Sequence, residues 1–216
     1  MSARRQRQMC IRDRYFDSET KFFRGKLSDG SWRTPFDPYS AAHRTNDYCE
    51  GNAWQYLWLT PQDPEGLIDL MGGEETFTQK LDSLFTISSE LDDNASVDIS
   101  GMIGQYAHGN EPSHHVAYMY SYAGKQYKTA PIIRTINNTL YTDQPDGLSG
   151  NEDCGQMSAW YIFSSIGFYP VNPTNGVYVF GSPLFDEVKI NLPQDNQFII
   201  KAENNSDLNI YIQSVK

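Results

Sequence analysis

The sequence lacks long hydrophobic runs and has few basic residues beyond its first segment. No apolar stretch approaches the roughly 18 to 20 residues that a membrane-spanning helix needs, so we expect a soluble protein without a membrane span. The 216 residues carry a formal net charge of −10. Because phosphate contacts require a basic surface, this charge argues against nucleic acid as a partner. A neutral or cationic ligand, or a metal ion, fits it better.

Cysteine is scarce, and the common catalytic motifs are missing. Cys10, Cys49 and Cys154 are an odd number without the C-x-x-C spacing of a metal site, so we expect no disulfide framework and reduced thiols at Cys49 and Cys154. The sequence contains no G-x-S-x-G elbow, no P-loop and no G-x-G-x-x-G that opens a helix after a strand. These absences argue against nucleophile-elbow hydrolases, P-loop proteins and dinucleotide-binding enzymes.

The first fourteen residues differ from the rest in charge. MSARRQRQMCIRDR holds five arginines and one aspartate, and it lacks the apolar segment of a secretory signal. It resembles the translated read-through of a sequencing adapter. We therefore expect residues 1–14 to be a non-native leader, with the true N-terminus and any signal peptide missing.

The apolar periodicity predicts helices first and strands last. Helices are expected at about 50–60, 72–85, 113–124, 128–141 and 154–168. In the second of these, Phe77, Leu81, Leu84 and Phe85 fall on one helical face. Short alternating segments predict strands: GVYVFGSPLF, DEVKINLP, QFIIKAEN and LNIYIQSVK. This order predicts a mainly α fold whose loops bring polar motifs to one rim, followed by a small β segment.

The stretch NDYCEGNAWQYLW places a carboxyl group beside aromatic residues. In a helix that starts at Glu50, Trp54 and Trp58 follow at i+4 and i+8, on the face of the carboxyl group. An aromatic neighbourhood favours the protonated form of a carboxyl group, which is what a general acid needs. The alternative is an exposed first-turn glutamate that the helix dipole favours.

A second carboxylate pair stands in PDGLSGNEDCGQMSAWYIFSSIGFYP. Asn151, Glu152 and Asp153 precede a predicted helix, where free backbone N–H groups favour ionised carboxylates. An ionised carboxylate suits a general base or a metal-linked role. The alternative is that Asn151 or Asp153 simply caps the helix.

The third motif, HGNEPSHH at residues 108–115, combines histidines with oxygen donors. His114 and His115 are adjacent and point about 100° apart in a helix, so they are poorly placed to chelate one ion together. Oxygen groups such as Asn110 and Glu111 favour a hard cation, calcium for example, although no EF-hand pattern is present. The alternative is a solvated polar loop.

Together these motifs favour carboxylate chemistry between aromatic walls. Aromatic residues make up 13% of the chain, and they suit either a core or the binding of sugar rings. Two carboxyl groups on either side of a sugar bond are the recurring solution for glycoside hydrolysis.

In this order, EGNAWQY, HGNEPSHH, PDGLSGNEDCGQMSAWYIFSSIGFYP and YVFGSPLF resemble the C-terminal half of the glycoside hydrolase family 92 α-mannosidases, from about residue 33 to the end. The resemblance implies an exo-acting, inverting α-mannosidase that needs calcium. It also implies an N-terminal β-sandwich domain followed by an (α/α)6 barrel. Residues 15–172 would then hold the later helices of the barrel, and residues 173–216 its closing strands. The chain would be a fragment that lacks the β-sandwich.

The resemblance also assigns roles to individual residues. Glu50 matches the general acid and Asp153 the general base. Asn151 stands where a second acidic residue often occurs, and Glu152 is a candidate to share that role. Trp54, Asn110, Glu111, Asn151 and Glu152 are candidates for substrate binding, and Glu111 and Asp153 for binding Ca²⁺.

The expected substrate is a mannose-containing glycan, and the resemblance implies a periplasmic or extracellular location. Two other readings stay open: a non-catalytic carbohydrate-binding module, and an inactive truncated product.

Overall fold

A computed structural model of the chain describes residues 13–42 and 46–216. These residues fall into two compact units, which divide the chain between Ser113 and His114. Most of the predicted leader, residues 1–12, lies outside the described part of the chain. The boundary between the units falls inside 15–172, the range that the sequence assigned to one piece of a barrel.

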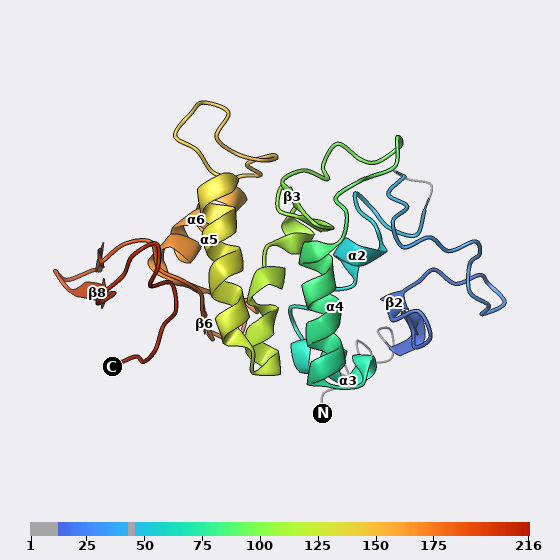
Figure 1. Cartoon of the computed structure of the whole chain (residues 1–216), viewed down its shortest axis with the longest axis horizontal. Coiled ribbons are helices and arrows are strands. Elements are labelled where there is room, and N and C mark those ends of the chain that lie inside the picture. The colour runs from blue at the N-terminus through green and yellow to red at the C-terminus, as the bar shows by residue number, and fades with distance from the viewer. Residues whose placement is uncertain (1–12, 43–45) are drawn as a thin grey trace. The chain divides into compact units, whose positions relative to one another are not determined.

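In the first unit, the described residues include two small hairpins and the helices α2, α3 and α4 (Figure 1). Its hairpins are antiparallel: β1 pairs with β2, and β3 with β4. In chain order its elements are β1 (Phe16–Asp17), β2 (Phe22–Phe23), α2 (Ala53–Tyr56), α3 (Pro64–Met71), α4 (Glu74–Thr86), β3 (Met102–Ile103), β4 (Tyr106–Ala107) and the 3-10 helix η1 (Glu111–Ser113).

The apolar face predicted for α4 forms part of the core of the first unit. Phe77, Leu81 and Leu84 are at most 1% exposed, as the i, i+4, i+7 spacing predicts. Trp58 is fully buried and packs edge-on against Phe77, with the ring centroids 5.4 Å apart. Phe85, the last residue of the predicted face, is only half-buried.

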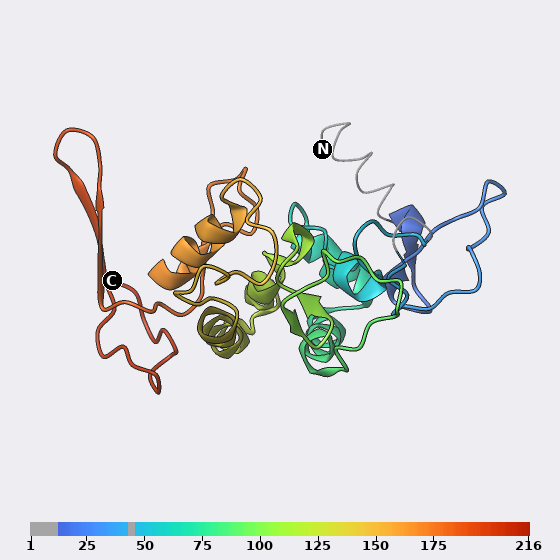
Figure 2. The same cartoon turned by 90° about the horizontal axis from the view of Figure 1, so that it is seen from above.

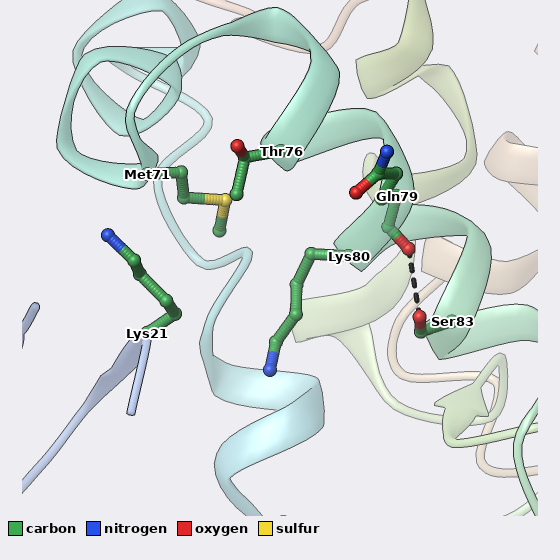
Figure 3. A pocket seen from close by; sticks show the side chains of 6 residues that line it. All are labelled: Lys21, Met71, Thr76, Gln79, Lys80 and Ser83. Carbon is green, nitrogen blue, oxygen red and sulfur yellow. Dashed lines mark hydrogen bonds between the residues drawn. The ribbon is translucent and has the colours of Figure 1, made fainter. Parts of the chain in front are cut away.

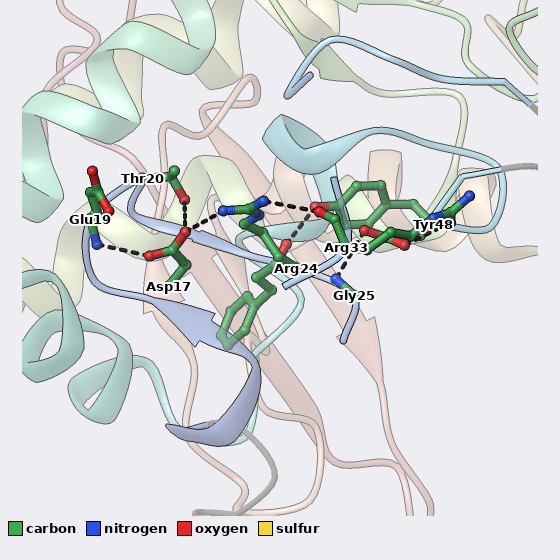
Figure 4. A network of polar contacts seen from close by, with 9 residues as sticks. Asp17, Glu19, Thr20, Arg24, Gly25, Arg33 and Tyr48 are labelled. Atoms are coloured by element: carbon green, nitrogen blue, oxygen red, sulfur yellow. Dashed lines mark hydrogen bonds and ion pairs between the residues drawn. The ribbon is translucent and has the colours of Figure 1, made fainter. Parts of the chain in front are cut away.

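A buried ion pair joins the two strands of the first hairpin (Figure 4). Arg24 Nη1 lies 2.7 Å from Asp17 Oδ2, and both side chains are less than a tenth exposed. Thr20 Oγ1 and the Glu19 N–H also donate to the Asp17 carboxylate, each at 3.0 Å. Arg24 Nη2 donates to the carbonyl oxygen of Arg33, so the same guanidinium also fixes the chain that follows the hairpin.

The second unit holds two α-helices, two 3-10 helices and two hairpins (Figure 2). Helices α5 and α6 pack against each other, and the hairpins pair β5 with β6 and β7 with β8. In chain order its elements are η2 (Val116–Ala123), η3 (Gln126–Lys128), α5 (Thr129–Thr139), α6 (Gln156–Ile166), β5 (Phe168–Tyr169), β6 (Val179–Phe180), β7 (Glu187–Asn191) and β8 (Gln197–Lys201).

An aromatic core holds the second unit together. Tyr118 of η2 stacks on Tyr169 of β5 with a centroid distance of 4.9 Å, and its hydroxyl donates to Ser164 Oγ on α6. Trp160 of α6 is 1% exposed, and its Nε1 donates to the backbone oxygen of His114. Tyr118 and Trp160 therefore each pair the polar edge of a buried ring with a hydrogen-bond partner.

The predicted order of helices before strands is confirmed, with two corrections. The helix expected at 50–60 is only the four residues of α2. The segment 208–216 is not a strand: Ser182 Oγ donates to the Ile210 oxygen, and Leu208 is 89% exposed. A strand needs a neighbouring edge to pair with, and β-propensity cannot supply one. Helix-rich architecture is thus observed, while closure into an (α/α)6 barrel stays a prediction.

We expect Asp17→Asn to destabilise the protein by about 3 kcal/mol, because it leaves the Arg24 charge buried without its partner. Burial raises the pKa of Asp17, but the hydrogen bonds from Arg24, the Glu19 N–H and Thr20 outweigh burial and hold that pKa below its ordinary value of 3.8. The stabilisation is therefore complete above pH 3.8 and is lost as the pH falls through the lowered pKa. Urea titrations between pH 3 and pH 7 measure the difference. The exposed Asp37→Asn serves as the control, with an expected change below about 0.5 kcal/mol.

Candidate active site

Glu50 lies in a turn before α2 and not in the helix itself. The helix begins at Ala53, and Asn52 is its N-cap: the Asn52 side chain accepts from the Gln55 N–H while the Gln55 side chain accepts from the Asn52 N–H. This capping box is visible in the sequence as Asn-x-x-Gln, and sequence reasoning missed it. Because Glu50 precedes the cap, the predicted stacking with Trp54 and Trp58 at helical spacing is wrong.

Three buried amide side chains fix the beginning of α2. Asn52 Nδ2 donates to the side-chain oxygen Oε1 of Gln105 at 2.8 Å. Gln55 Nε2 donates to the backbone carbonyl oxygen of Gln105 at 3.1 Å. All three residues are at most 4% exposed. Gln105 Nε2 in turn donates to the carbonyl oxygens of Ser88 and Glu90. A satisfied buried network of this kind specifies one arrangement of the backbone around it.

The structure brings together Glu50, Asn110 and Glu111, three of the predicted site residues. Asn110 is 6% exposed, and its Nδ2 donates to the Glu50 carbonyl oxygen at 3.1 Å. The Glu111 N–H donates to Asn110 Oδ1, also at 3.1 Å. Glu50 is half-buried and Glu111 is exposed. Both carboxylates act on Tyr56: burial, and after it the charges of Cys49, Glu50 and Glu111, raise the pKa of Tyr56 to about 12.

Trp54, predicted to contact the sugar, is packed inside the first unit. It is 7% exposed, and its ring lies edge-on to Phe22 at 5.1 Å and tilted to Tyr39 at 6.1 Å. Lys80 Nζ stands 4.1 Å from the centroid of the ring. These contacts account for Trp54 as a core residue, and its contact with substrate stays a prediction.

In the second unit, Glu152 caps α6. Its Oε1 accepts from the Ser158 N–H at 3.0 Å, and its Oε2 accepts from the Gly155 N–H. Hydrogen bonds from Ser158, and then from Gly155, hold the pKa of Glu152 below its ordinary value. The capping role that the sequence left open for Asn151 or Asp153 is thus taken by Glu152.

Asp153 is exposed at the mouth of the same helix. It has a φ of 50°, Cys154 follows with 58° and Gly155 with 96°, so three consecutive residues are left-handed. Glu50 has a φ of 56°. Non-glycine residues seldom adopt this region, and they cluster at functional sites when they do. Both predicted catalytic carboxylates therefore stand on unusual backbone, one in each unit. Asn151, two residues before Asp153, is exposed.

The described side chains do not assemble a metal centre by themselves. Within residues 13–42 and 46–216, no three His, Cys, Asp or Glu side chains lie close enough to hold an ion. His114 and His115 are buried, and Gln156 Nε2 lies 3.1 Å from His114 Nδ1. Calcium needs six to eight oxygen ligands, so Glu111 and Asp153 could supply only part of a cage.

A cavity of about 220 Å³ in the first unit is separate from the predicted carboxylates (Figure 3). Its lining is neutral or basic, and the Lys21 and Lys80 ammonium groups point in different directions. Lys80 Nζ stands 3.7 Å from the centre of the Phe22 ring, and burial lowers the pKa of Lys80 to about 8. The residues that line it are Lys21, Met71, Thr76, Gln79, Lys80 and Ser83.

Cys49 and Cys154 are free thiols, as predicted. No helix in the described residues has the length and the apolar character to cross a membrane.

A sequence profile of the glycosyl hydrolase family 92 catalytic domain matches residues 12–216. The chain belongs to glycoside hydrolase family 92. It is similar to an α-mannosidase of this family from Bacteroides thetaiotaomicron, solved in complex with mannoimidazole: the sequences are 44% identical, the TM-score is 0.86, and the match covers 93% of this chain and 27% of that one.

Two further relatives agree with this assignment. A family 92 inverting mannosidase from Bacteroides thetaiotaomicron VPI-5482 is 37% identical with a TM-score of 0.74, over 90% of this chain and 27% of that one. An uncharacterized secreted glycosidase of Arthroderma benhamiae is 28% identical over 204 residues, which are 89% of this chain and 24% of that protein. The family 92 chain thus spans about a quarter of the length of these relatives.

We expect Glu152→Ala to lower the thermal midpoint at pH 7 by roughly 2 °C, because the first N–H groups of α6 lose their acceptor. Since the pKa of Glu152 is lowered, the cap persists above its ordinary value of 4.5 and is lost as the pH falls through the lowered pKa. Circular dichroism melts at pH 7 and pH 3 measure this. The exposed Asp146→Ala is the control; an equal midpoint in both variants at pH 7 contradicts the capping role.

Proposed function

We propose that this chain is part of the catalytic region of a calcium-dependent, inverting exo-α-mannosidase that acts on mannose-containing glycans. The supporting observation is that Glu50 and Asp153, matched by motif to the acid and the base, both adopt left-handed backbone, at φ 56° and 50°. Membership of family 92 and the likeness to solved mannosidases give the substrate class.

The proposed mechanism divides the work between these two carboxyl groups. Glu50, half-buried and beside Tyr56, protonates the oxygen of the leaving group. Asp153, exposed at the mouth of α6, deprotonates a water that attacks from the opposite face of the sugar. Inversion follows because the water replaces the leaving group in a single displacement. Glu152 is engaged as a helix cap, so we assign the base to Asp153 alone.

The remaining predicted site residues are proposed to bind substrate. Asn110 and Glu111 lie beside Glu50, and their proposed partner is the sugar in the leaving position. Asn151 and Glu152 directly precede the proposed base in the chain. Trp54, whose ring packs in the core, would contribute by supporting the segment that carries Glu50.

Calcium dependence is proposed on the resemblance alone. When bound, calcium would polarise sugar hydroxyl groups. Because no three acidic or histidine side chains converge within the described residues, we derive no step through the ion. Glu111 and Asp153 stay its proposed ligands in this chain, with the others supplied from elsewhere in a longer enzyme.

The proposed parent enzyme is longer than this chain and is exported. Its relatives are between three and four times as long, and one of them is described as secreted. The parent would contain the β-sandwich and the early helices of the (α/α)6 barrel. Two alternatives compete with this proposal for the isolated chain: a carbohydrate-binding module without activity, and an inert truncated product.

We expect the isolated chain to show little or no hydrolysis of an aryl α-mannoside, whereas the longer enzyme that contains it is active. In the longer enzyme, Glu50→Gln and Asp153→Asn should each lower kcat at least 100-fold, since each removes one proton transfer. NMR of the first-formed sugar should show β-mannose. Asp146→Asn, in an exposed loop, is the matched control and should keep full activity.

Three results would count against this proposal. Robust turnover by the isolated chain would show that the rest of the barrel is not needed. α-Mannose as the first product would indicate retention. A crystal structure of the longer enzyme in which the two carboxyl groups lie outside roughly 6.5 to 9.5 Å would contradict the inverting assignment, because closer groups leave no room for a water and more distant groups cannot act on the same sugar bond.

We expect calcium to raise the thermal midpoint of the longer enzyme and a chelator to abolish its activity. At 100 times its dissociation constant, a ligand stabilises the folded state by about 2.7 kcal/mol. Differential scanning calorimetry with calcium, magnesium or chelator measures this. An unchanged midpoint together with unchanged activity in the chelator contradicts calcium dependence.

A further inference from the structure

The turn at Cys49–Gly51 is held by side chains from outside it. Tyr56 Oη donates a hydrogen bond to the Cys49 carbonyl oxygen, and Asn110 Nδ2 donates to the Glu50 carbonyl oxygen at 3.1 Å. Between these two contacts the backbone of Glu50 is left-handed. A glutamate keeps that conformation only where its surroundings fix it, because its Cβ disfavours it.

Gly51 allows the Tyr56 ring to lie against this turn. A Cβ at position 51 would stand 2.6 Å from Tyr56 Cε2 and 3.1 Å from Gln55 Oε1, so any side chain there would displace the ring. The ring also contacts Tyr48, with centroids 5.6 Å apart. Tyr56 is the last residue of α2, and α2 is anchored by the buried amides of its capping box. The helix therefore carries the ring to a defined place.

The chemistry of the phenol suits a permanent donor. Burial, and then the charges of Cys49, Glu50 and Glu111, raise the pKa of Tyr56 to about 12. The hydroxyl therefore stays protonated at every pH at which a carboxyl acid and base can work. A phenol that lost this proton would have no hydrogen to donate, and its negative oxygen would repel the Cys49 carbonyl oxygen.

We propose that Tyr56 is a positioning residue for Glu50, with Asn110 as its counterpart on the other side of the turn. Tyr56 holds the Cys49 carbonyl, Asn110 holds the Glu50 carbonyl, and together they set the direction in which the Glu50 carboxyl group leaves the backbone. The consequence for the reaction rests on the proposed role of Glu50 as general acid; the backbone contacts do not.

The kinetic test uses the longer enzyme and two aryl α-mannosides, one with a good leaving group (2,4-dinitrophenol) and one with a poor one (4-methylphenol). A misplaced general acid slows only the substrate whose leaving group needs a proton. We expect Tyr56→Phe to lower kcat about 10-fold for the poor leaving group and less than 2-fold for the good one, with KM unchanged. Glu50→Gln should show the same asymmetry, only larger.

Tyr48→Phe is the matched control. Tyr48 also donates to a backbone oxygen and packs against Tyr56, but its hydroxyl bonds Phe23, which lies outside the Cys49–Gly51 turn. The Tyr48→Phe variant should lose thermal stability as the Tyr56→Phe variant does, but it should keep its kcat for both substrates. Asn110→Asp keeps the acceptor for the Glu111 N–H but loses the donor to Glu50, and should repeat the leaving-group asymmetry. Thermal melts of all variants check that each is folded.

A second measurement, made on the isolated chain, tests the positioning role of Tyr56 separately from the proposed mannosidase function. The Cα and carbonyl chemical shifts of Glu50 report its left-handed backbone in the native chain, and Tyr56→Phe should move them toward ordinary values. Unchanged Glu50 shifts, or an equal loss of kcat for both leaving groups, overturn the positioning role. An enzyme without α-mannosidase activity overturns the proposed function, while the shift change would still support the backbone role of Tyr56.

Discussion

Left-handed backbone at two carboxylates is the constraint on which the rest of the candidate site depends. Glu50 and Asp153 have φ values of 56° and 50°. Such residues are strained and keep their conformation only when neighbours determine it. Each unit supplies neighbours in its own way: hydrogen bonds from buried or half-buried side chains hold the first turn, and a glycine with a φ of 96° continues the second. The unusual backbone therefore indicates where the fold is built around particular side chains.

Glu152 and Asp153 are adjacent and chemically similar, yet they differ in backbone and in exposure. The Glu152 side chain turns back to accept from the N–H groups of Gly155 and Ser158, and so it stabilises the start of α6. Asp153 stands one residue later on left-handed backbone, where its carboxylate is exposed. Because the helix end is already capped, the Asp153 carboxylate is not needed for that purpose. Charge near this helix end thus stabilises the helix at Glu152, while the role of Asp153 as base stays a proposal.

The aromatic richness of the chain serves its core more than its surface. Trp54, Trp58 and Trp160 are at most 7% exposed and pack against other rings, the first two edge-on and Trp160 stacked. Aromatic side chains bury large areas, so a few of them stabilise units of about a hundred residues each. The aromatic residue next to Glu50 is Tyr56, whose polar edge can bond the backbone while its ring packs. Phenylalanine would fill the same space but would lack the hydroxyl group that donates to the Cys49 carbonyl oxygen.

The sequence by itself determined the family, the order of helices before strands, the buried face of α4 and the free thiols, because long motifs, periodicity and spacing are local properties. Only the tertiary structure decided that α2 begins after Glu50, that Glu152 is the cap, and that Tyr56 and Asn110 bracket one turn. Asn110 and Glu50 are sixty positions apart, and periodicity carries no information at that range. The segment 208–216 alternates like a strand but is not paired as one in the structure, so propensity alone predicted the wrong structure.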